Sequence, residues 1–250
     1  MKITLFTKND PLGDSTESTH TDKNGKVIAV YNDGDLGVYK HDDIDASKYK
    51  GEKINKADKS TTLMGYTYLW NSFTNRGGNN KPKGIIDFAS SEAENWLSDF
   101  EQSMHSLQSS VGAWAGIRDY AIHAGNGDKY DFKAKEGKSV YRGSRIYTPS
   151  NDLSHPVYVS ARDVGNIAPG IAANIMGQSK LDFMLSAGGF ALSGNSKWDF
   201  FWHTEKWVDK AKAVGPPAYG EDYESHFFQS FGYDCWKFVE PPKTYLVPKK

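Results

Sequence analysis

Hydrophobic and polar positions change their period along the chain near residue 85. Before that point, apolar residues alternate with polar ones in short runs that are typical of half-buried strands. Two of these runs, residues 26–31 and 36–40, flank an Asn-Asp-Gly-Asp turn, which predicts a β-hairpin. Residues 9–25 are polar and rich in turn formers, and residues 41–60 are charged without a period, as in a linker or exposed loop. Strands are predicted at residues 2–6, 26–31, 36–40 and 61–73.

After residue 85, apolar residues recur every three or four positions, which is the spacing of one face of a helix. Residues 129–133 and 139–147 interrupt this pattern and are expected to be short strands. The chain is therefore predicted to have an α+β fold, with an N-terminal β-hairpin region and linker over residues 1–85 and a mainly helical domain with a few short strands over residues 86–250. Helices are predicted at residues 90–107, 111–125, 160–179, 180–192, 198–214 and 222–233.

The predicted helix at residues 160–179 breaks local rules more often than the others. It opens well, because Ser160 is a favourable N-cap and Asp163 completes a capping box three residues later. Its interior nevertheless contains Gly165 and Gly170, each costing about 1 kcal/mol against Ala, and Pro169, which costs about 3 kcal/mol. Breaks of this kind indicate close backbone packing, a kink or a functional site.

Polar residues accompany these breaks. Asp163 and Asn166 are three residues apart, so a helix places both on one side near its positive end, with Arg162 beside them. Arg162 could clamp an anionic oxygen, Asp163 could act as a base or metal ligand, and Asn166 could orient either. The structural alternative is that Asp163 only caps the helix, Asn166 only bonds to a loop, and the glycines only admit another helix.

Charge and cysteine content narrow the classes of function. The net charge of the 250 residues is −1, so a nucleic-acid enzyme would need a local basic patch. The single cysteine, Cys235, excludes an internal disulfide and a cysteine-based metal cluster, and we expect it to be a packing residue. No apolar run reaches the length of a membrane span, and residues 1–6 are too short and too soon followed by polar residues for a signal peptide. Export would therefore need a dedicated apparatus.

A carboxylate and an amine form a second candidate site. On the expected strand at residues 129–133, Asp131 and Lys133 would point to the same side. Such a pair can hold a divalent cation and polarise a phosphate, although an ordinary surface ion pair has the same spacing. Among the histidines, His123 has the most suggestive neighbourhood, because a glycine-rich turn separates it from Asp131. His20 and His41 are expected to be exposed.

A polar stripe on the last predicted helix is the third candidate. Asp222, His226 and Gln229, together with Ser225, recur at helical spacing, while phenylalanines occupy the opposite side. These side chains could bind substrate. A solvated face of an amphipathic helix gives the same pattern.

Four short motifs, taken in order, resemble the bacterial polymorphic toxin type 44 family. Residues 20–41 also resemble the segment that precedes such domains in Rhs-type exported proteins. The motifs are Tyr130-Asp-Phe-Lys133, Arg162-Asp-Val-Gly-Asn-Ile-Ala-Pro-Gly170, the glycine pair in Ser186-Ala-Gly-Gly189, and Tyr219-Gly-Glu-Asp222 running to Gln229-Ser-Phe-Gly-Tyr233.

The resemblance implies a secreted toxin for competition between bacteria, delivered into target cells by a secretion or injection apparatus and neutralised in the producer by a cognate immunity protein. Two positions depart from the family pattern: Tyr130 stands where many relatives have Trp, and Ala168 where some have His. If that His were the family's base, His123 or His226 would have to replace it. The matching positions are Asp131, Lys133, Asp163, Asn166, Gly170, Asp222 and Gln229.

Three functions remain open at this point. The first is a nuclease toxin acting on RNA or DNA, in which Asp131 and Asp163 converge as base or metal ligands while Lys133 and Arg162 stabilise negative charge and Asn166 orients substrate. The second is a toxin that hydrolyses peptidoglycan or a lipid intermediate of the cell envelope, which the near-neutral charge and 14% aromatic content suit. The third is a non-enzymatic module that docks onto the secretion apparatus.

Overall fold

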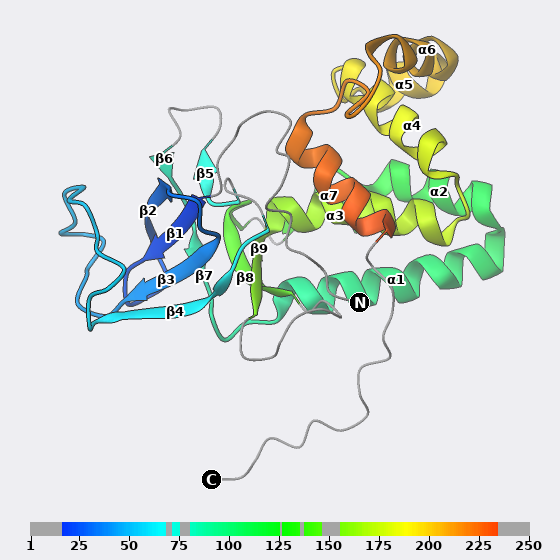
Figure 1. The fold of residues 1–250 in the computed structure, drawn as a ribbon. Helices are drawn as coiled ribbons and strands as arrows, with labels where there is room; N and C mark the ends of the chain where they lie inside the picture. Colours follow the sequence, from blue (N-terminus) through cyan, green and yellow to red (C-terminus); the bar gives the residue numbers. More distant parts are fainter. Residues whose placement is uncertain are drawn as a thin grey trace.

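Strands and helices occupy separate halves of the computed structural model (Figure 1), which confirms the predicted α+β fold. The structure describes residues 17–68, 72–75, 81–125, 127–135, 138–146 and 156–234. The strand predicted at residues 2–6 and the packing role of Cys235 lie outside the described residues. No helix in the described ranges is long and apolar enough to cross a bilayer.

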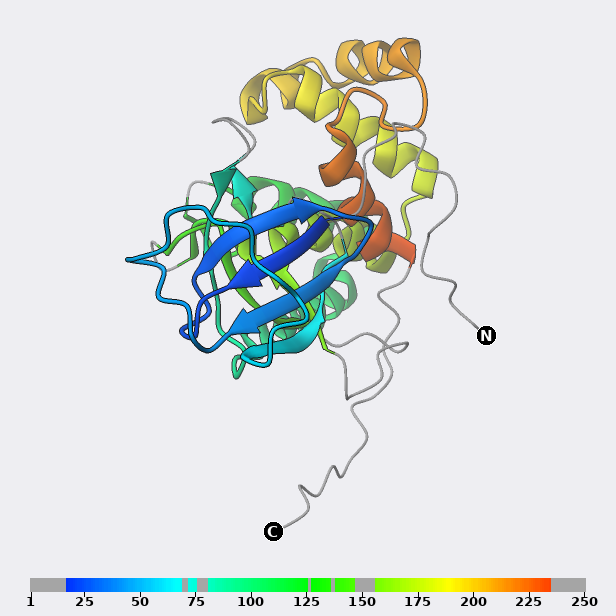
Figure 2. The ribbon, with the colours of Figure 1, turned by 60° about the vertical axis from the view of Figure 1, so that its left-hand side comes forward.

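Seven strands form the main sheet, in the spatial order β2-β1-β3-β4-β9-β8-β7. Both orientations occur, since β1 is antiparallel to β2 but parallel to β3, and β4 is parallel to β9. Figure 2 shows β1 to β3 side by side in front of the helical half. The strands are β1 (Glu17–Thr21), β2 (Val27–Asn32), β3 (Gly37–His41), β4 (Thr61–Tyr66), β7 (Ile85–Ile86), β8 (Arg142–Ile146) and β9 (Val157–Ser160), with a separate small hairpin of β5 (Thr74–Asn75) and β6 (Lys81–Pro82).

The two ends of this strand order meet, so the sheet closes on itself. Lys26, just before β2, forms a β-bridge with Ile85 of β7. The N–H of Val27 donates to the carbonyl of Gly84 at 3.0 Å, and the N–H of Ile86 donates to that of Gly25 at 2.8 Å. The closed sheet has its own apolar cluster, drawn from opposite strands and the segment before β5: Val27, Val38, Phe73, Ile86 and Tyr158.

The predicted pairing of residues 26–31 with 36–40 as a hairpin is wrong, although both segments are strands. β1 lies between them and bonds to both. Its sequence is Glu-Ser-Thr-His-Thr, and all but the first of these polar residues are buried. Hydrogen bonds from side chains stabilise the buried strand, and its sequence lacks the alternation of hydrophobic and polar residues that predicts a strand.

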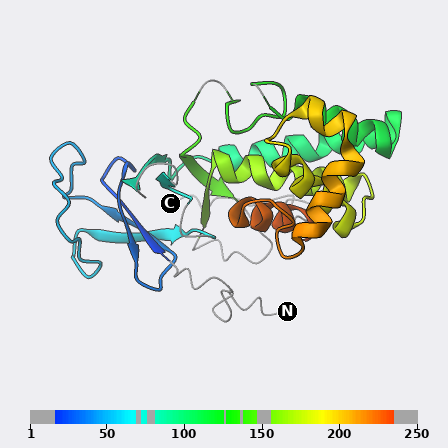
Figure 3. The same cartoon turned by 90° about the horizontal axis from the view of Figure 1, so that it is seen from above.

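Helices α1 (Glu92–Val111), α2 (Ala113–His123), α3 (Ala161–Ile175) and α7 (Tyr223–Asp234) enclose the larger core. Seen from above, α1 and α3 run alongside each other away from the strands (Figure 3). α4 (Lys180–Leu192), α5 (Lys197–Trp202) and α6 (Thr204–Val214) form a lobe beyond them. The predicted helix at 198–214 is therefore two helices, separated at His203.

Glycines set the distance between α3 and α7. A Cβ at Gly170 would lie 2.1 Å from the carbonyl oxygen of Gln229, and one at Gly232 would lie 2.1 Å from that of Ile167. Arg162 bonds to Glu224 near the start of both helices, and Asn174 bonds to the carbonyl of Tyr233 near their ends, so the two helices run parallel and their N-terminal ends meet. The glycines of the predicted 160–179 helix thus permit a close backbone contact.

Two further sequence expectations need correction. Residues 129–133 form a turn rather than a strand, because the Asp131 carboxylate accepts hydrogen bonds from the backbone of this segment and folds it back. His20 and His41 are 0% and 1% exposed rather than on the surface. Residues 42–60 lack regular structure as expected, but they cover one face of β1 to β3 (Figure 2).

Candidate functional site

The N-terminus of α3 is held by a complete capping box. The N–H of Asp163 donates to Ser160 Oγ at 3.3 Å, and the N–H of Ser160 donates to Asp163 Oδ2 at 2.7 Å. Asp163 is 0% exposed, and burial raises the pKa of its carboxyl above the ordinary range. This geometry is that of a structural cap, so the predicted base or metal-ligand role of Asp163 would have to be performed without solvent access.

Arg162 joins the beginnings of the two parallel helices. One guanidinium nitrogen donates to Glu224 Oε1 of α7 at 2.6 Å, and Nε lies 4.0 Å from Asp163 Oδ1. The guanidinium also lies over the ring of Tyr141, 5.3 Å from its centroid. Glu224 is almost completely buried, so the pair has a charge-assisted hydrogen bond of low solvent exposure.

Lys133 extends across α3 toward the same place. Its aliphatic stem lies against Gly165, where a Cβ would be 2.6 Å from Lys133 Cγ. Burial lowers the pKa of the Lys133 ammonium, while the charges of Glu221 and Asp222 oppose that shift. Gly165 therefore has a role that the sequence left open, since it provides the space in which Lys133 reaches the start of α7.

Asp131 orders the turn that carries Lys133. Its Oδ2 accepts the N–H of Gly127 at 2.9 Å, and its Oδ1 accepts that of Ala134 at 3.2 Å. The carboxylate thus occupies the position of a turn-stabilising group. Asp131 and Lys133 were predicted to point to the same side of a strand, and this prediction is wrong because the strand does not form. Asp131 is still one of the charges that act on Lys133.

Glu221 is the carboxyl that sequence reasoning missed. Gln229 Nε2 donates to Glu221 Oε2 at 3.0 Å, and burial raises the Glu221 pKa. Gln229 is itself buried rather than on a solvated face, and its Oε1 has no hydrogen-bond partner within the described residues. The helix begins only at Tyr223, so a helical phase counted from residue 222 cannot place Glu221. Glu224 was missed as well. It lies eight residues before Gly232, which contacts α3, and this helical spacing was the available signal for its place between the two helices.

The remaining candidates lie outside this Lys133 cluster, which we define as Lys133, Arg162, Glu221, Asp222, Glu224 and Gln229. His123 is the last residue of α2, with Nδ1 2.6 Å from Asp128 and Nε2 3.6 Å from Asp119. Burial and the charge of Lys180 lower the pKa of His226, which belongs to α7 and not to the cluster. Asn166 is buried on α3, one turn beyond Arg162.

The Lys133 cluster has the groups for acid–base and electrostatic chemistry. Two cations meet where two helices present their positive ends, a location that favours negative charge on a bound group. Burial raises the pKa of Glu221 and lowers that of Lys133, and perturbed pKa values of this kind are typical of functional sites. In the parts of the chain that the structure describes, no three His, Cys, Asp or Glu side chains are grouped to hold a metal ion.

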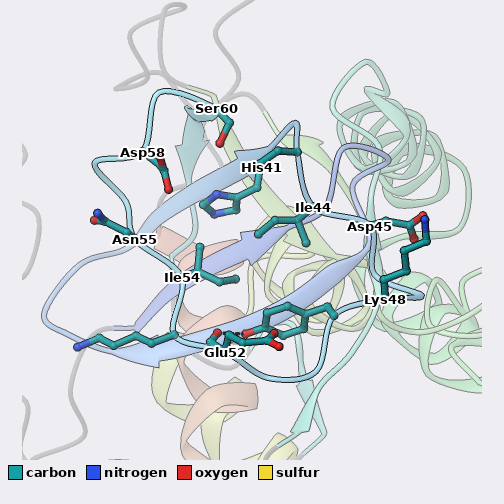
Figure 4. Close-up of a pocket in the computed structure, with 12 residues that line it drawn as sticks. His41, Ile44, Asp45, Lys48, Glu52, Ile54, Asn55, Asp58 and Ser60 are labelled. Carbon is teal, nitrogen blue, oxygen red and sulfur yellow. Dashed lines mark hydrogen bonds between the residues drawn. The ribbon is translucent and has the colours of Figure 1, made fainter.

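A cavity lies elsewhere, formed by residues 43–60 and His41 of β3. Its volume is about 350 Å³, six of its twelve lining residues are Asp, Glu or Lys, and His41, Ile44 and Ile54 lie at its centre (Figure 4). The cavity shares no residue with the Lys133 cluster.

Comparisons with known proteins leave the family open. No protein-family model matches the chain, and neither a curated protein nor a solved structure is similar to it.

Proposed function

We propose that the chain is an antibacterial toxin that is secreted through a specialised system into competing cells, and that its Lys133 cluster hydrolyses phosphodiester bonds of RNA or DNA. The carrying observation is the meeting of Lys133 and Arg162 at the paired N-terminal ends of α3 and α7, beside the raised-pKa carboxyl of Glu221. The ordered motifs that resemble type 44 toxins contain Lys133, Arg162 and Gln229. A cognate immunity protein is expected in the producing cell.

In this mechanism the chain's own side chains supply each step. Glu221 in its carboxylate form takes a proton from water, and the water oxygen attacks phosphorus. Lys133 and Arg162 stabilise the negative charge that develops on the phosphoryl oxygens, which in comparable sites contributes about 3–4 kcal/mol per donor. The leaving oxygen receives the proton from Glu221, so the carboxylate is restored.

Cations that rest on aromatic rings support a polyanionic substrate. Lys135 and Arg142 lie over the ring of Trp96, at 5.0 and 4.6 Å from its centroid. Lys83 lies 5.0 Å from the Tyr141 centroid, the ring that Arg162 also covers. These contacts hold positive groups near the cluster, where phosphates on either side of the cleaved bond would bind.

The test is expression of the full chain in a sensitive bacterium, once in the cytoplasm and once with a periplasmic signal. Lys133→Met and Glu221→Gln are the site variants, and Lys129→Met, which removes an exposed lysine of the same segment, is the matched control. We expect arrest of growth and cleavage of nucleic acid from the cytoplasm only, lost in both site variants and kept in the control. Full toxicity of a folded double variant would refute the assignment.

One observation favours the envelope hydrolase as a second candidate. The carboxyls Glu221, Asp222 and Glu224 outnumber the two cations of the cluster, which suits a neutral glycan or peptide better than a phosphate chain. Glu221 would then be a proton donor, as raised-pKa carboxyls are in glycoside hydrolysis. Killing from the periplasm alone, with lysis of the cells, would favour the envelope hydrolase. Toxicity that survives every cluster variant would leave the non-enzymatic docking module.

A further inference from the structure

Five side chains form a continuous run of hydrogen bonds through the strand half. Thr61 Oγ1 lies 2.9 Å from His41 Nδ1, and His41 Nε2 lies 2.8 Å from His20 Nδ1. His20 Nε2 lies 3.1 Å from Ser18 Oγ, which donates to Asp33 Oδ2 at 2.8 Å. The run crosses β4, β3 and β1 and ends in the turn after β2.

The direction in which hydrogen bonds are donated along this run follows from the charge of Asp33 at its end. Burial alone would raise the pKa of Asp33, but hydrogen bonds from Lys56 and Ser18 lower it overall, so Asp33 is an acceptor only. Ser18 donates its hydroxyl proton to Asp33, so its oxygen must accept a hydrogen bond from His20 Nε2–H. His20 Nδ1 is then a lone pair that accepts from His41 Nε2–H. His41 Nδ1 in turn accepts the hydroxyl proton of Thr61, so every donor points toward Asp33.

The first added proton enters this arrangement at His41 Nδ1, the outer nitrogen of the histidine pair. The Thr61 hydroxyl has a second acceptor, the carbonyl of Asn55 at 3.4 Å, so it can turn and accept from a protonated His41. With that proton in place, a second one on His20 Nδ1 would face His41 Nε2–H across 2.8 Å, donor against donor. The second proton therefore cannot enter without breaking the contact between the rings.

Groups from every neighbouring element bias the two steps. The rings of Tyr31, Tyr39 and His41 pack around His20 at centroid distances of 4.9, 5.3 and 5.1 Å. Burial lowers the His41 pKa, while three carboxylates around it act in the opposite direction. The charged groups that act on the pair are Asp42, Asp43 and Asp58 near His41, and Lys56, Asp33 and Asp35 near His20.

We propose that this run of hydrogen bonds is a two-step acid switch. The first proton enters at His41 Nδ1 and leaves the run intact, and the second enters at His20 Nδ1 and separates β1 from β3. Lys56, which ties residues 42–60 to Asp33 and Asp35, would be repelled by a charged His20. The covering segment and the cavity that it forms with His41 (Figure 4) would then open together.

Burial lowers the pKa of His20 to about 4, so the order of the steps can be read from side-chain nitrogen shifts of the full chain between pH 7.5 and about pH 3. We expect both buried histidines to carry their proton on Nε2 at pH 7.5, and His41 to titrate before His20. When His20 titrates, backbone amides of β1 and β3 should exchange at least about tenfold faster, because a buried hydrogen bond has been lost, while α3 and α7 stay protected.

His20→Gln is the matched variant, since a glutamine amide can donate to Ser18 and accept from His41 but cannot be protonated in this range. It should keep β1 and β3 protected at the pH at which they open in the wild type, whereas replacement of the exposed His203 by Gln should change nothing. An Nδ1-protonated His20 at pH 7.5, titration of His20 before His41, or equal acid opening in His20→Gln would overturn the proposal. The first two results need no variant.

Discussion

The side chain of Lys133 lies flat against Gly165, one turn into α3. No other residue type at position 165 leaves room for it, because even a Cβ would approach Lys133 Cγ to 2.6 Å. The atoms on the lysine side belong to a flexible chain, so an added methyl group would displace Lys133 and spare the backbone.

Gly165→Ala should therefore separate activity from stability. The helix gains up to about 1 kcal/mol in propensity, which offsets the crowding, while the Lys133 ammonium moves away from Glu221. We expect the free energy of unfolding in urea to stay within about 1 kcal/mol of wild type and toxicity or cleavage to fall at least about tenfold. Gly125→Ala, where the added carbon meets only ordinary contacts, is the control. An active Gly165→Ala protein would exclude a role for Lys133 position.

Gly232→Ala, in contrast, should lower the stability of the fold. Its Cβ would lie 2.1 Å from the backbone oxygen of Ile167, and a backbone oxygen cannot move aside. α3 and α7 would have to separate, with a loss of about 2 kcal/mol or more in the free energy of unfolding. Thermal and urea unfolding measure this directly. A Gly232→Ala protein as stable as the wild type would mean that the two helices are not in backbone contact.

Lys133→Met should abolish activity without lowering stability. The environment as a whole disfavours the ammonium, because burial lowers its pKa despite the nearby carboxylates. A neutral side chain of similar length removes that cost, so we expect a free energy of unfolding at pH 7 that is unchanged or up to ~1 kcal/mol higher. A destabilised variant would indicate that Lys133 is a structural counter-ion.

The pH dependence of stability should change in Asp163→Asn. The fold raises the Asp163 pKa, so the contribution of the neutral carboxyl is present below the unfolded pKa of about 3.9 and is lost as the pH rises through the folded pKa. Asn keeps an oxygen for the Ser160 N–H and never ionises. We expect the variant to gain stability relative to wild type as the pH rises from 4 to 8, as measured by urea unfolding at each pH.

Activity of the same Asp163→Asn protein tests its predicted catalytic role. A cap alone predicts that toxicity is retained, because the capping hydrogen bonds survive. A base or metal ligand at this position predicts that toxicity is lost while the fold remains.

The sequence was informative where local rules decide the outcome. The capping box of Ser160 and Asp163 and the helical periods were readable because they depend on neighbours within one or two turns. β1 was not, since its buried Ser18 and His20 side chains bond to Asp33 and His41, which are distant in the sequence. Glu221 was missed for the same reason, because only the fold brings it to Lys133. Gly165 was singled out correctly, but its partner could not be named.

The bridge between Lys26 and Ile85 determines what happens if the chain is cut near residue 85. β7 would lose its hydrogen bond with Gly25 and its bridge with Lys26, and β9 would lose β4. Both would then present unpaired N–H and C=O groups, the kind of open edge on which strands of other molecules assemble. Residues 86–250 produced alone are thus expected to aggregate, and proteolytic trimming of the first 85 residues would inactivate by exposing an adhesive edge rather than release a free-standing domain.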